Sequence, residues 1–273
     1  MIPDIQLQQI AADISAAQTD VRQIDSFSAR YPAFDLESAY AVARIQHQQR
    51  LDQGATMVGR KIGFTNPAMW ARFGVHQPLW APLYQKTVAY IDQAEVACSL
   101  GGFTEPKIEP ELVLHFHRTP PVTDDPAAIL ACVDWVAHAF EIVQSHYPNW
   151  EFSAADVVAD DVLHGALLIG PPCNIAELGP GLIERLKTFS VALYAQGDLR
   201  ETGEGRNVLG CPATAVAYLQ QVLDQQPECS TLQAGELVTT GTITTALPVK
   251  AGETWETRIS GLDVPGLKVR FTR

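Results

Sequence analysis

The sequence predicts an α+β fold, in which helices and strands occupy different stretches of the chain. Residues 1–54 have the apolar spacing of helices, whereas the chain from about residue 87 is dominated by short apolar runs typical of strands. Helices and strands do not alternate regularly, as they would in a doubly wound parallel sheet. The 273 residues contain no evident repeat, low-complexity segment or long linker.

Two helices are predicted in the N-terminal part. Ile10 and Ile14 share a face of the first at helical spacing. Asp35 is of the residue type that caps the start of a helix, and Gly54 stands where a glycine would end the second one. The apolar stripe of this second helix consists of Leu36, Ala39, Tyr40 and Ala43.

A short strand-like run at 57–64 follows, and residues 65–86, rich in Pro and Trp, predict loop and short helix. Later apolar runs predict strands at 87–91, 108–117, 140–145, 166–170, 188–196 and 267–272. A soft boundary near residue 85 therefore separates a helical N-terminal region, 1–85, from a mainly β domain, 86–273. We expect the two parts to pack as one unit.

Two further helices are predicted within the β region. Asp125 and Pro126 have the residue types of an N-cap and a first helical position. The stripe of that helix would consist of Ile129, Val133, Val136 and Phe140. A second helix near 212–224 opens with Pro212.

Composition excludes several classes of function. The formal net charge is -12 and 47% of the residues are apolar, so nucleic acid and anionic membrane surfaces are poor partners. The N-terminus lacks the features of a signal peptide, and no apolar run approaches membrane-spanning length. The cysteines are odd in number and form no C-x-x-C pair, which favours a reducing compartment. We therefore expect a cytoplasmic protein.

Two carboxylates stand two residues apart at the start of one predicted strand. Because alternate side chains of a strand share a face, Glu109 and Glu111 point the same way. The opposite face is apolar and consists of Ile108, Leu112, Leu114 and Phe116. Two like charges side by side repel unless a cation lies between them. All-oxygen ligation favours a hard divalent ion such as Mg2+ or Mn2+.

The pair alone leaves two interpretations open. A solvated strand edge would also tolerate acidic side chains, and edges accommodate the missing N–H of Pro110. Glu141 favours the metal site, because it is a lone acid between Phe140 and Ile142, where an unpaired charge is costly to bury. We therefore expect Glu109, Glu111 and Glu141 to hold a metal ion together.

Several short motifs lie between about residue 34 and the C-terminus, and their order and spacing together form a pattern. These motifs are 35–42, 59–65, 74–78, 107–111, 141–143, 158–160, 208–212, 240–244 and 248–253. With them the chain resembles the fumarylacetoacetate hydrolase superfamily, in the branch of 2-oxopent-4-enoate hydratase and 4-oxalocrotonate decarboxylase. The resemblance implies a mixed β-roll with flanking helices as the catalytic domain, built by residues 86–273.

The resemblance also implies a site and a chemistry. Members are homo-oligomers that act on small 2-oxo acids, several of them in aromatic catabolism, with Mg2+ or Mn2+ held by the three glutamates. Lys61, bracketed by Gly59 and Gly63, would lie near the substrate and offset the excess negative charge of three glutamates on a 2+ ion. Asp160 is either a second catalytic group or a turn cap. The expected substrate-binding residues are Gln77, Leu79, Leu112, Leu163, His164, Thr240, Gly241 and Thr242.

The chain departs from its relatives at four places. Leu79 follows Pro78 where an acid is usual, and Gln144-Ser145-His146 replaces Asp-Ser-Arg. Asp161 replaces an amide and Leu163 replaces a hydroxyl. A decarboxylase of this branch needs a pocket for a second substrate carboxylate. Because Leu79, Trp80 and Leu163 are too apolar to receive one, the sequence favours the hydratase. The decarboxylase and a non-catalytic 2-oxo-acid-binding subunit remain the alternatives.

Overall fold

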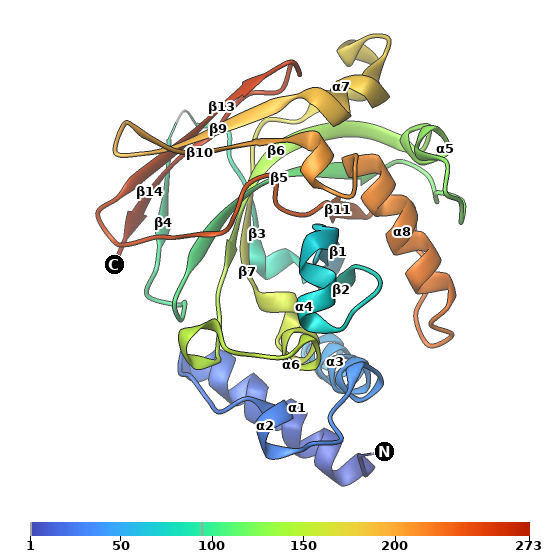
Figure 1. Cartoon of the computed structure of the whole chain (residues 1–273), viewed down its shortest axis with the longest axis vertical. Coiled ribbons are helices and arrows are strands. Elements are labelled where there is room, and N and C mark those ends of the chain that lie inside the picture. Colours follow the sequence, from blue (N-terminus) through green and yellow to red (C-terminus); the bar gives the residue numbers. More distant parts are fainter. Residues whose placement is uncertain (1, 94) are drawn as a thin grey trace.

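The computed structural model describes residues 2–93 and 95–273, which form two β-sheets with helices around them (Figure 1). The larger sheet has the strand order β2-β1-β11-β5-β6-β7-β3, with β12 paired to β5 and β8 to β6. The smaller sheet has the order β10-β9-β13-β14-β4. Both sheets mix parallel with antiparallel pairs, since β1 runs parallel to β11 and β14 parallel to β4. The predicted α+β class is confirmed.

The strands differ widely in length. Those of the larger sheet are β1 (Met57–Gly63), β2 (Leu79–Tyr84), β3 (Val88–Tyr90), β5 (Lys107–Phe116), β6 (Val133–Val143), β7 (His164–Ile169), β8 (Cys173–Asn174), β11 (Leu237–Thr239) and β12 (Leu247–Pro248). Those of the smaller sheet are β4 (Val96–Ser99), β9 (Ser190–Ala195), β10 (Asp198–Glu204), β13 (Thr254–Ser260) and β14 (Lys268–Thr272). The long pair β5 and β6 forms the centre of the molecule.

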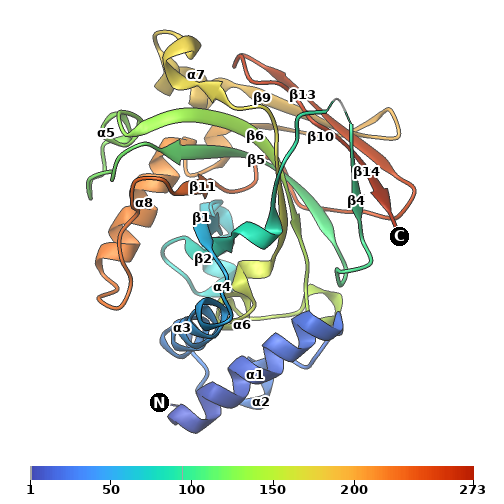
Figure 2. The same ribbon diagram turned by 180° about the vertical axis from the view of Figure 1, so that it is seen from behind.

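The α-helices cover two sides of the larger sheet. They are α1 (Asp4–Asp20), α2 (Phe27–Arg30), α3 (Leu36–Asp52), α4 (Trp70–Phe73), α5 (Pro126–Leu130), α6 (Ala154–Ala159), α7 (Leu182–Thr188) and α8 (Pro212–Asp224). Single 3-10 turns lie at Pro67–Met69, Gln85–Thr87, Pro148–Trp150, Asp161–Leu163, Ile175–Leu178 and Gly205–Asn207. Helices α1, α2, α3 and α6 gather at the end of the molecule opposite the smaller sheet, as both views show (Figures 1 and 2).

The N-terminal helices form for the reasons the sequence gives. Ile10 and Ile14 are fully buried on one face of α1. The Asp35 side chain accepts a hydrogen bond from the Ser38 N–H at 2.9 Å and so caps α3. Helix α8 begins at Pro212 as predicted. Within the described residues, none of the helices combines the length and the apolar character that crossing a membrane requires.

The predicted helix with a stripe from Ile129 to Phe140 is wrong. Helix α5 ends at Leu130, and Val133, Val136 and Phe140 lie on strand β6. Their spacing imitates a helix because β6 is buried on both faces, and a strand without a polar face shows no alternation.

Residues 65–86 also differ from the prediction. Besides loop and short helix, they contain strand β2, which pairs antiparallel with β1. Pro82 lies within this strand, and β2 is at the edge of the sheet, where a missing N–H is tolerated. Residues 57–84 therefore contribute two strands to the same sheet that carries β5 and β6.

Candidate active site

The strand pair β5–β6 brings the predicted carboxylates together. Glu109 lies directly opposite Glu141 in the antiparallel register, and Glu111 follows two residues later on the same face of β5. Glu109, Glu111 and Glu141 each offer an oxygen within 4.8 Å of the others. On the opposite face of β5, Ile108 and Leu112 are fully buried. Glu111 and Glu141 are buried as well, so the solvated-edge interpretation fails for this strand.

Glu111 is held by the last residue of β11 and by the segment that follows it. Its Oε2 atom accepts hydrogen bonds from the Thr239 hydroxyl and from the Gly241 N–H, the latter at 2.8 Å. Gly241 has φ +105, and a Cβ there would meet the Thr65 hydroxyl oxygen at 2.2 Å. Only glycine therefore lets this backbone N–H reach the carboxylate.

Glu141 has one satisfied and one unsatisfied oxygen. Its Oε1 atom accepts from Lys61 Nζ at 2.8 Å and pairs with His164 Nδ1 at 2.7 Å. The other ring nitrogen of His164 lies 2.8 Å from the Thr87 hydroxyl, which orients the imidazole. Glu141 Oε2 is buried and has no hydrogen-bond partner among the described residues. A buried carboxylate oxygen without a donor is costly, and a cation is the group that would satisfy it.

The three carboxylates perturb one another's protonation. Burial, with repulsion from Glu141, raises the pKa of Glu109 to about 7 against the attraction of Lys61. Burial and both neighbouring acids raise the pKa of Glu111 well above its usual range. Burial acts to raise the pKa of Glu141 too, but Lys61 and His164 outweigh it and lower that pKa to about 2. A divalent cation would remove this repulsion, so these oxygen ligands fit the predicted metal.

Lys61 remains an ammonium group in this setting. Burial alone would lower its pKa, but Glu141, Glu109 and Glu111 outweigh the burial and raise it. Its Nζ donates to Glu141 and, at 2.8 Å, to the backbone oxygen of Val162. The lysine is therefore a fixed positive charge beside the carboxylates.

A left-handed turn supplies the second acceptor of Lys61. Asp161, Val162 and Leu163 have φ values of 50, 51 and 63, which only glycine adopts without strain. The Arg50 side chain holds Asp161 through two hydrogen bonds of 2.8 and 2.5 Å. Gly63 permits the approach of the turn to β1, since a Cβ there would meet Val162 Cγ1 at 2.5 Å.

Asp160 directly precedes this turn, and its carboxylate is held by His146 and Gln18. Both of its oxygens lie within 2.9 Å of His146 Nδ1, and Gln18 donates to Oδ1 at 3.0 Å. Its backbone oxygen accepts from the Leu163 N–H at 2.7 Å. Between the two interpretations that the sequence left open, this placement favours the structural one, a residue that anchors the turn.

A cavity of about 670 Å³ opens beside the carboxylates. Glu109 and Glu111 lie on its wall, together with Gly241 and Thr242, two of the residues expected to bind substrate. Other parts of the wall were not anticipated from the sequence. They are aromatic at Phe64, Phe73, Trp150 and Phe152, and polar at Thr65, Asn66, Glu201, Arg206, Asn207, Thr244 and Thr245. The only sequence signal was their nearness to motifs of the resemblance.

The remaining predicted substrate-binding residues have other surroundings. Leu79 and Leu163 pack in the hydrophobic cluster of the N-terminal helices, and Leu112 lies in the core on the face of β5 opposite Glu111. Thr240 is buried and bonds to the backbone oxygen of Leu112. Gln77 is partly buried before β2. Leu79 and Leu163 therefore do not decide whether the cavity accepts a second carboxylate.

Comparison with known proteins agrees with this site. The model of the family described as fumarylacetoacetate (FAA) hydrolase C-terminal matches residues 59–268, so the chain belongs to that family. Within it, the chain is 30% identical to 2-keto-4-pentenoate hydratase 1 of Dechloromonas aromatica (strain RCB), over 92% of each protein. It is 31% identical to 4-oxalocrotonate decarboxylase of Pseudomonas sp. (strain CF600), over 94% of each.

A solved structure is similar over the whole fold. It is 4-oxalocrotonate decarboxylase from Pseudomonas putida G7, complexed with magnesium and adipate. The TM-score is 0.90 with 26% sequence identity, and the match covers 99% of each chain. The curled mixed sheets are therefore the fold of this family.

Proposed function

We propose that the protein is a divalent-metal-dependent lyase that adds water to a 2-hydroxydienoate or 2-oxoalkenoate, as a 2-keto-4-pentenoate hydratase does. The observation that carries the proposal is the buried cluster of Glu109, Glu111 and Glu141, with an unsatisfied Glu141 oxygen, on one wall of a large cavity. The similarity to several hydratases at about 30% identity supports the same activity.

The metal site would use the three glutamates as ligands. A bound Mg2+ or Mn2+ would supply Lewis acidity toward the carboxylate and 2-oxo groups of the substrate. Glu111 is preorganised by the Gly241 N–H and Glu141 by His164, so two of the ligands are fixed before the metal arrives. Glu109 is only partly buried, and it lines the cavity together with Glu111.

Lys61 would provide the positive charge and the mobile proton. An ammonium group has three N–H donors, and two of them are used by Glu141 and Val162. The third is available to an anionic substrate, which three glutamates would otherwise repel. The carboxylates raise the pKa of Lys61, and positive charge bound to them would oppose that rise, so Nζ could then hold or release a proton during water addition.

A decarboxylase is the second candidate, and one observation favours it. The cavity wall contains Arg206 and Asn207, which are polar groups able to receive a second carboxylate. The decarboxylase from Pseudomonas putida G7 holds adipate, a dicarboxylate. Arg206 is exposed and paired with Glu204 at 2.6 Å, so it would have to exchange that partner for a substrate carboxylate.

One experiment separates these activities. The Mg2+-loaded protein is given 2-hydroxypenta-2,4-dienoate in one assay and 2-oxohex-3-enedioate in another, with absorbance and CO2 followed together. A hydratase bleaches the first substrate without CO2, and a decarboxylase releases CO2 from the second. Binding of both without turnover would contradict an enzyme and indicate a binding subunit.

The variant Arg206→Met sharpens the comparison. If Arg206 binds a distal carboxylate, the variant raises KM for the enedioate and leaves KM for the monocarboxylate unchanged. Equal effects on both substrates would remove Arg206 from substrate recognition.

We also propose, with support from the family resemblance, that the protein works as a homo-oligomer and in the cytoplasm. The five cysteines, Cys98, Cys132, Cys173, Cys211 and Cys229, are free thiols, as a reducing compartment requires. The division into an N-terminal region, 1–85, and a catalytic domain, 86–273, belongs to the same proposal.

A further inference from the structure

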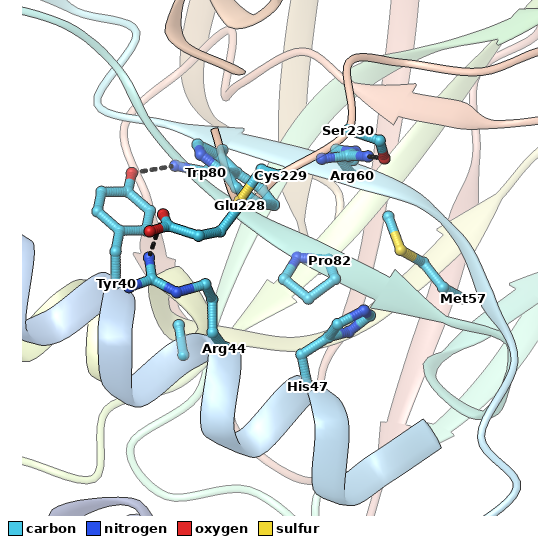
Figure 3. A pocket seen from close by; sticks show the side chains of 11 residues that line it. Tyr40, Arg44, His47, Met57, Arg60, Trp80, Pro82, Glu228, Cys229 and Ser230 are labelled. Carbon is cyan, nitrogen blue, oxygen red and sulfur yellow. Dashed lines mark hydrogen bonds and ion pairs between the residues drawn. The ribbon is translucent and has the colours of Figure 1, made fainter. Parts of the chain in front are cut away.

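A second cavity lies on the other side of strand β1 from the carboxylates. It has a volume of about 160 Å³ and is enclosed by α3, by β1 and β2, and by residues 228–230 (Figure 3). None of its wall residues lines the catalytic cavity. Arg60 and Lys61 are neighbours in β1, so their side chains leave the strand on opposite faces. Lys61 serves the carboxylates, and Arg60 lines this second cavity.

Arg60 is a buried cation with an open donor. Its side chain is 3% exposed. Nε lies 3.1 Å from a Glu236 oxygen, and Nη2 donates to the Ser230 hydroxyl at 3.2 Å. Nη1 has no hydrogen-bond partner among the described residues. The guanidinium also lies 5.0 Å over the Trp80 ring, which fixes its plane. Nη1 is not one of the buried atoms that lack a partner, so it is open to the cavity and can donate to an acceptor bound there.

A second arginine approaches the cavity from α3. Arg44 lies on the wall between Tyr40, one helical turn before it, and His47, one turn after it (Figure 3). Its partner is Glu228 at 3.6 Å, whose side chain is 61% exposed, so this ion pair is weak and easily exchanged. Burial raises the pKa of the Cys229 thiol, and both Arg60 and Arg44 oppose that rise. Both arginines line the same cavity, Arg60 from β1 and Arg44 from α3.

Beside the polar groups of His47, Glu228 and Ser230, the wall has an apolar part. Trp80 stacks on Tyr40 with ring centroids 5.9 Å apart, and its Nε1 donates to Gln226 at 3.1 Å. Ala43, Met57 and Pro82 complete the apolar part. An apolar cavity of about 150 Å³ in another protein holds benzene. The second cavity thus has room for a ring-sized apolar body beside two arginines.

We propose that this cavity is a binding site for a small organic monocarboxylate, whose carboxylate pairs with Arg60 Nη1 and Arg44 and whose apolar body packs against Trp80 and Pro82. An inorganic anion would leave the apolar part of the wall without a partner, and a neutral ring would make no use of the Arg60 donor. The site is independent of the proposed function, because it shares neither the metal ligands nor the cavity beside them.

The test uses benzoate as the probe and the Mg2+-loaded full-length protein, with binding measured by titration calorimetry. Benzoate lacks a 2-oxo group and so cannot chelate a metal as a 2-oxo acid would. We expect one benzoate per chain, with benzamide, its neutral isostere, and inorganic phosphate each binding at least about tenfold more weakly.

Three variants locate the site. Arg60→Met removes the buried donor, Arg44→Gln removes the exposed cation, and Ala43→Leu fills the cavity from α3 without altering charge. Each should weaken benzoate by about tenfold or more. Arg22→Gln, a surface ion-pair residue at the end of α1, is the matched control and should bind benzoate as the unchanged protein does.

Two further results complete the test. If circular dichroism shows that Arg60→Met does not fold, Arg44→Gln and Ala43→Leu still test whether benzoate binds in this cavity. Glu111→Gln, which alters only the carboxylate cluster, should bind benzoate normally. Benzoate affinity that is lost in Glu111→Gln but retained in Ala43→Leu would place the probe in the catalytic cavity and overturn the proposal.

Discussion

The carboxylate cluster illustrates how single side chains set the chemistry of this site. Lys61 offsets part of the negative charge, while burial, together with repulsion from neighbouring glutamates, raises the pKa of Glu109 and Glu111. The arrangement is unfavourable until a doubly charged ion joins it, because the positive charges that contact the three acids do not balance them. The unsatisfied oxygen of Glu141 points to the same conclusion.

At this scale we expect Glu109→Gln to lower Mn2+ or Mg2+ affinity by at least about 100-fold, more than the loss of an outer hydrogen-bond partner of a metal ligand causes. The fold should survive, because the Glu109 side chain is only partly buried. Titration calorimetry with each metal measures the change. Glu37→Gln, an exposed acid in the first turn of α3, is the control. Equal affinity in the Glu109 and Glu37 variants would show that Glu109 is not a ligand.

The turn 161–163 connects the N-terminal helices with the active site. Each residue held in the left-handed region costs about 1–3 kcal/mol, so the turn persists only because its surroundings hold it. Arg50 of α3 clamps Asp161, and Gln18 of α1 bridges Asp160 and Asp161. The Arg50 side chain also lies 5.1 Å from the centre of the Tyr84 ring. Two helices that never touch the carboxylates thereby position the backbone oxygen that receives Lys61.

For this element, Arg50→Met should release the turn and displace Lys61. We expect kcat to fall by about 10- to 100-fold, the cost of misplacing a group by about 1 Å, with little change in metal affinity. Arg30→Met removes a more exposed ion pair with Asp13 and should leave kcat unchanged. A double-mutant cycle decides the cause, since Arg50→Met should add little to Lys61→Met. Fully additive effects would mean that Arg50 does not act through the lysine.

At the scale of the whole molecule, the two sheets are joined by apolar packing and by one buried histidine. Phe140 and Ile108 of the larger sheet pack with Trp255 and Phe271 of the smaller. Within this layer, His138 Nδ1 donates to the backbone oxygen of Glu111 at 2.9 Å, because a carbonyl only accepts. Its Nε2 must then be the unprotonated nitrogen, which accepts from the Thr257 hydroxyl of β13 at 2.8 Å. Protonation would break this contact between the sheets.

The consequence is a dependence of stability on pH. Burial lowers the pKa of His138 to about 4, below the 6.5 of an exposed histidine. The unfolded chain therefore binds more protons between these values, and the folded state loses up to about 3 kcal/mol as the pH falls through that window. His138→Gln should be less stable than the unchanged protein at pH 7, and the difference should shrink by pH 4.5. Urea unfolding across this range measures it.

His76→Gln, an exposed histidine, provides the comparison. Its stability should differ from that of the unchanged protein by the same small amount at every pH. If the difference for His138→Gln were equally constant, the buried histidine would not be the source of the acid sensitivity.

Local signals in the sequence predicted some elements well and others poorly. Asp35 and Pro212 mark helix starts through local chemistry, and both helices begin there. Strand β6 was mistaken in part for a helix, because both of its faces are buried and the alternation that identifies a strand is missing. Its burial on both sides depends on β9 and β13 of the other sheet, which lie far along the chain.

The sequence by itself determined the carboxylate pair, since the two-residue period of a strand places Glu109 and Glu111 on one face wherever that strand lies. It also indicated Glu141, as a lone acid between Phe140 and Ile142, and it indicated Lys61 through the family motifs. Only the tertiary structure decided that Asp160 anchors a turn, that Leu79 and Leu163 pack in the core, and that Arg206 lines the cavity. The reason is physical: periodicity fixes which neighbours along the chain share a face, whereas the wall of a cavity is assembled from segments whose approach depends on packing across the whole molecule.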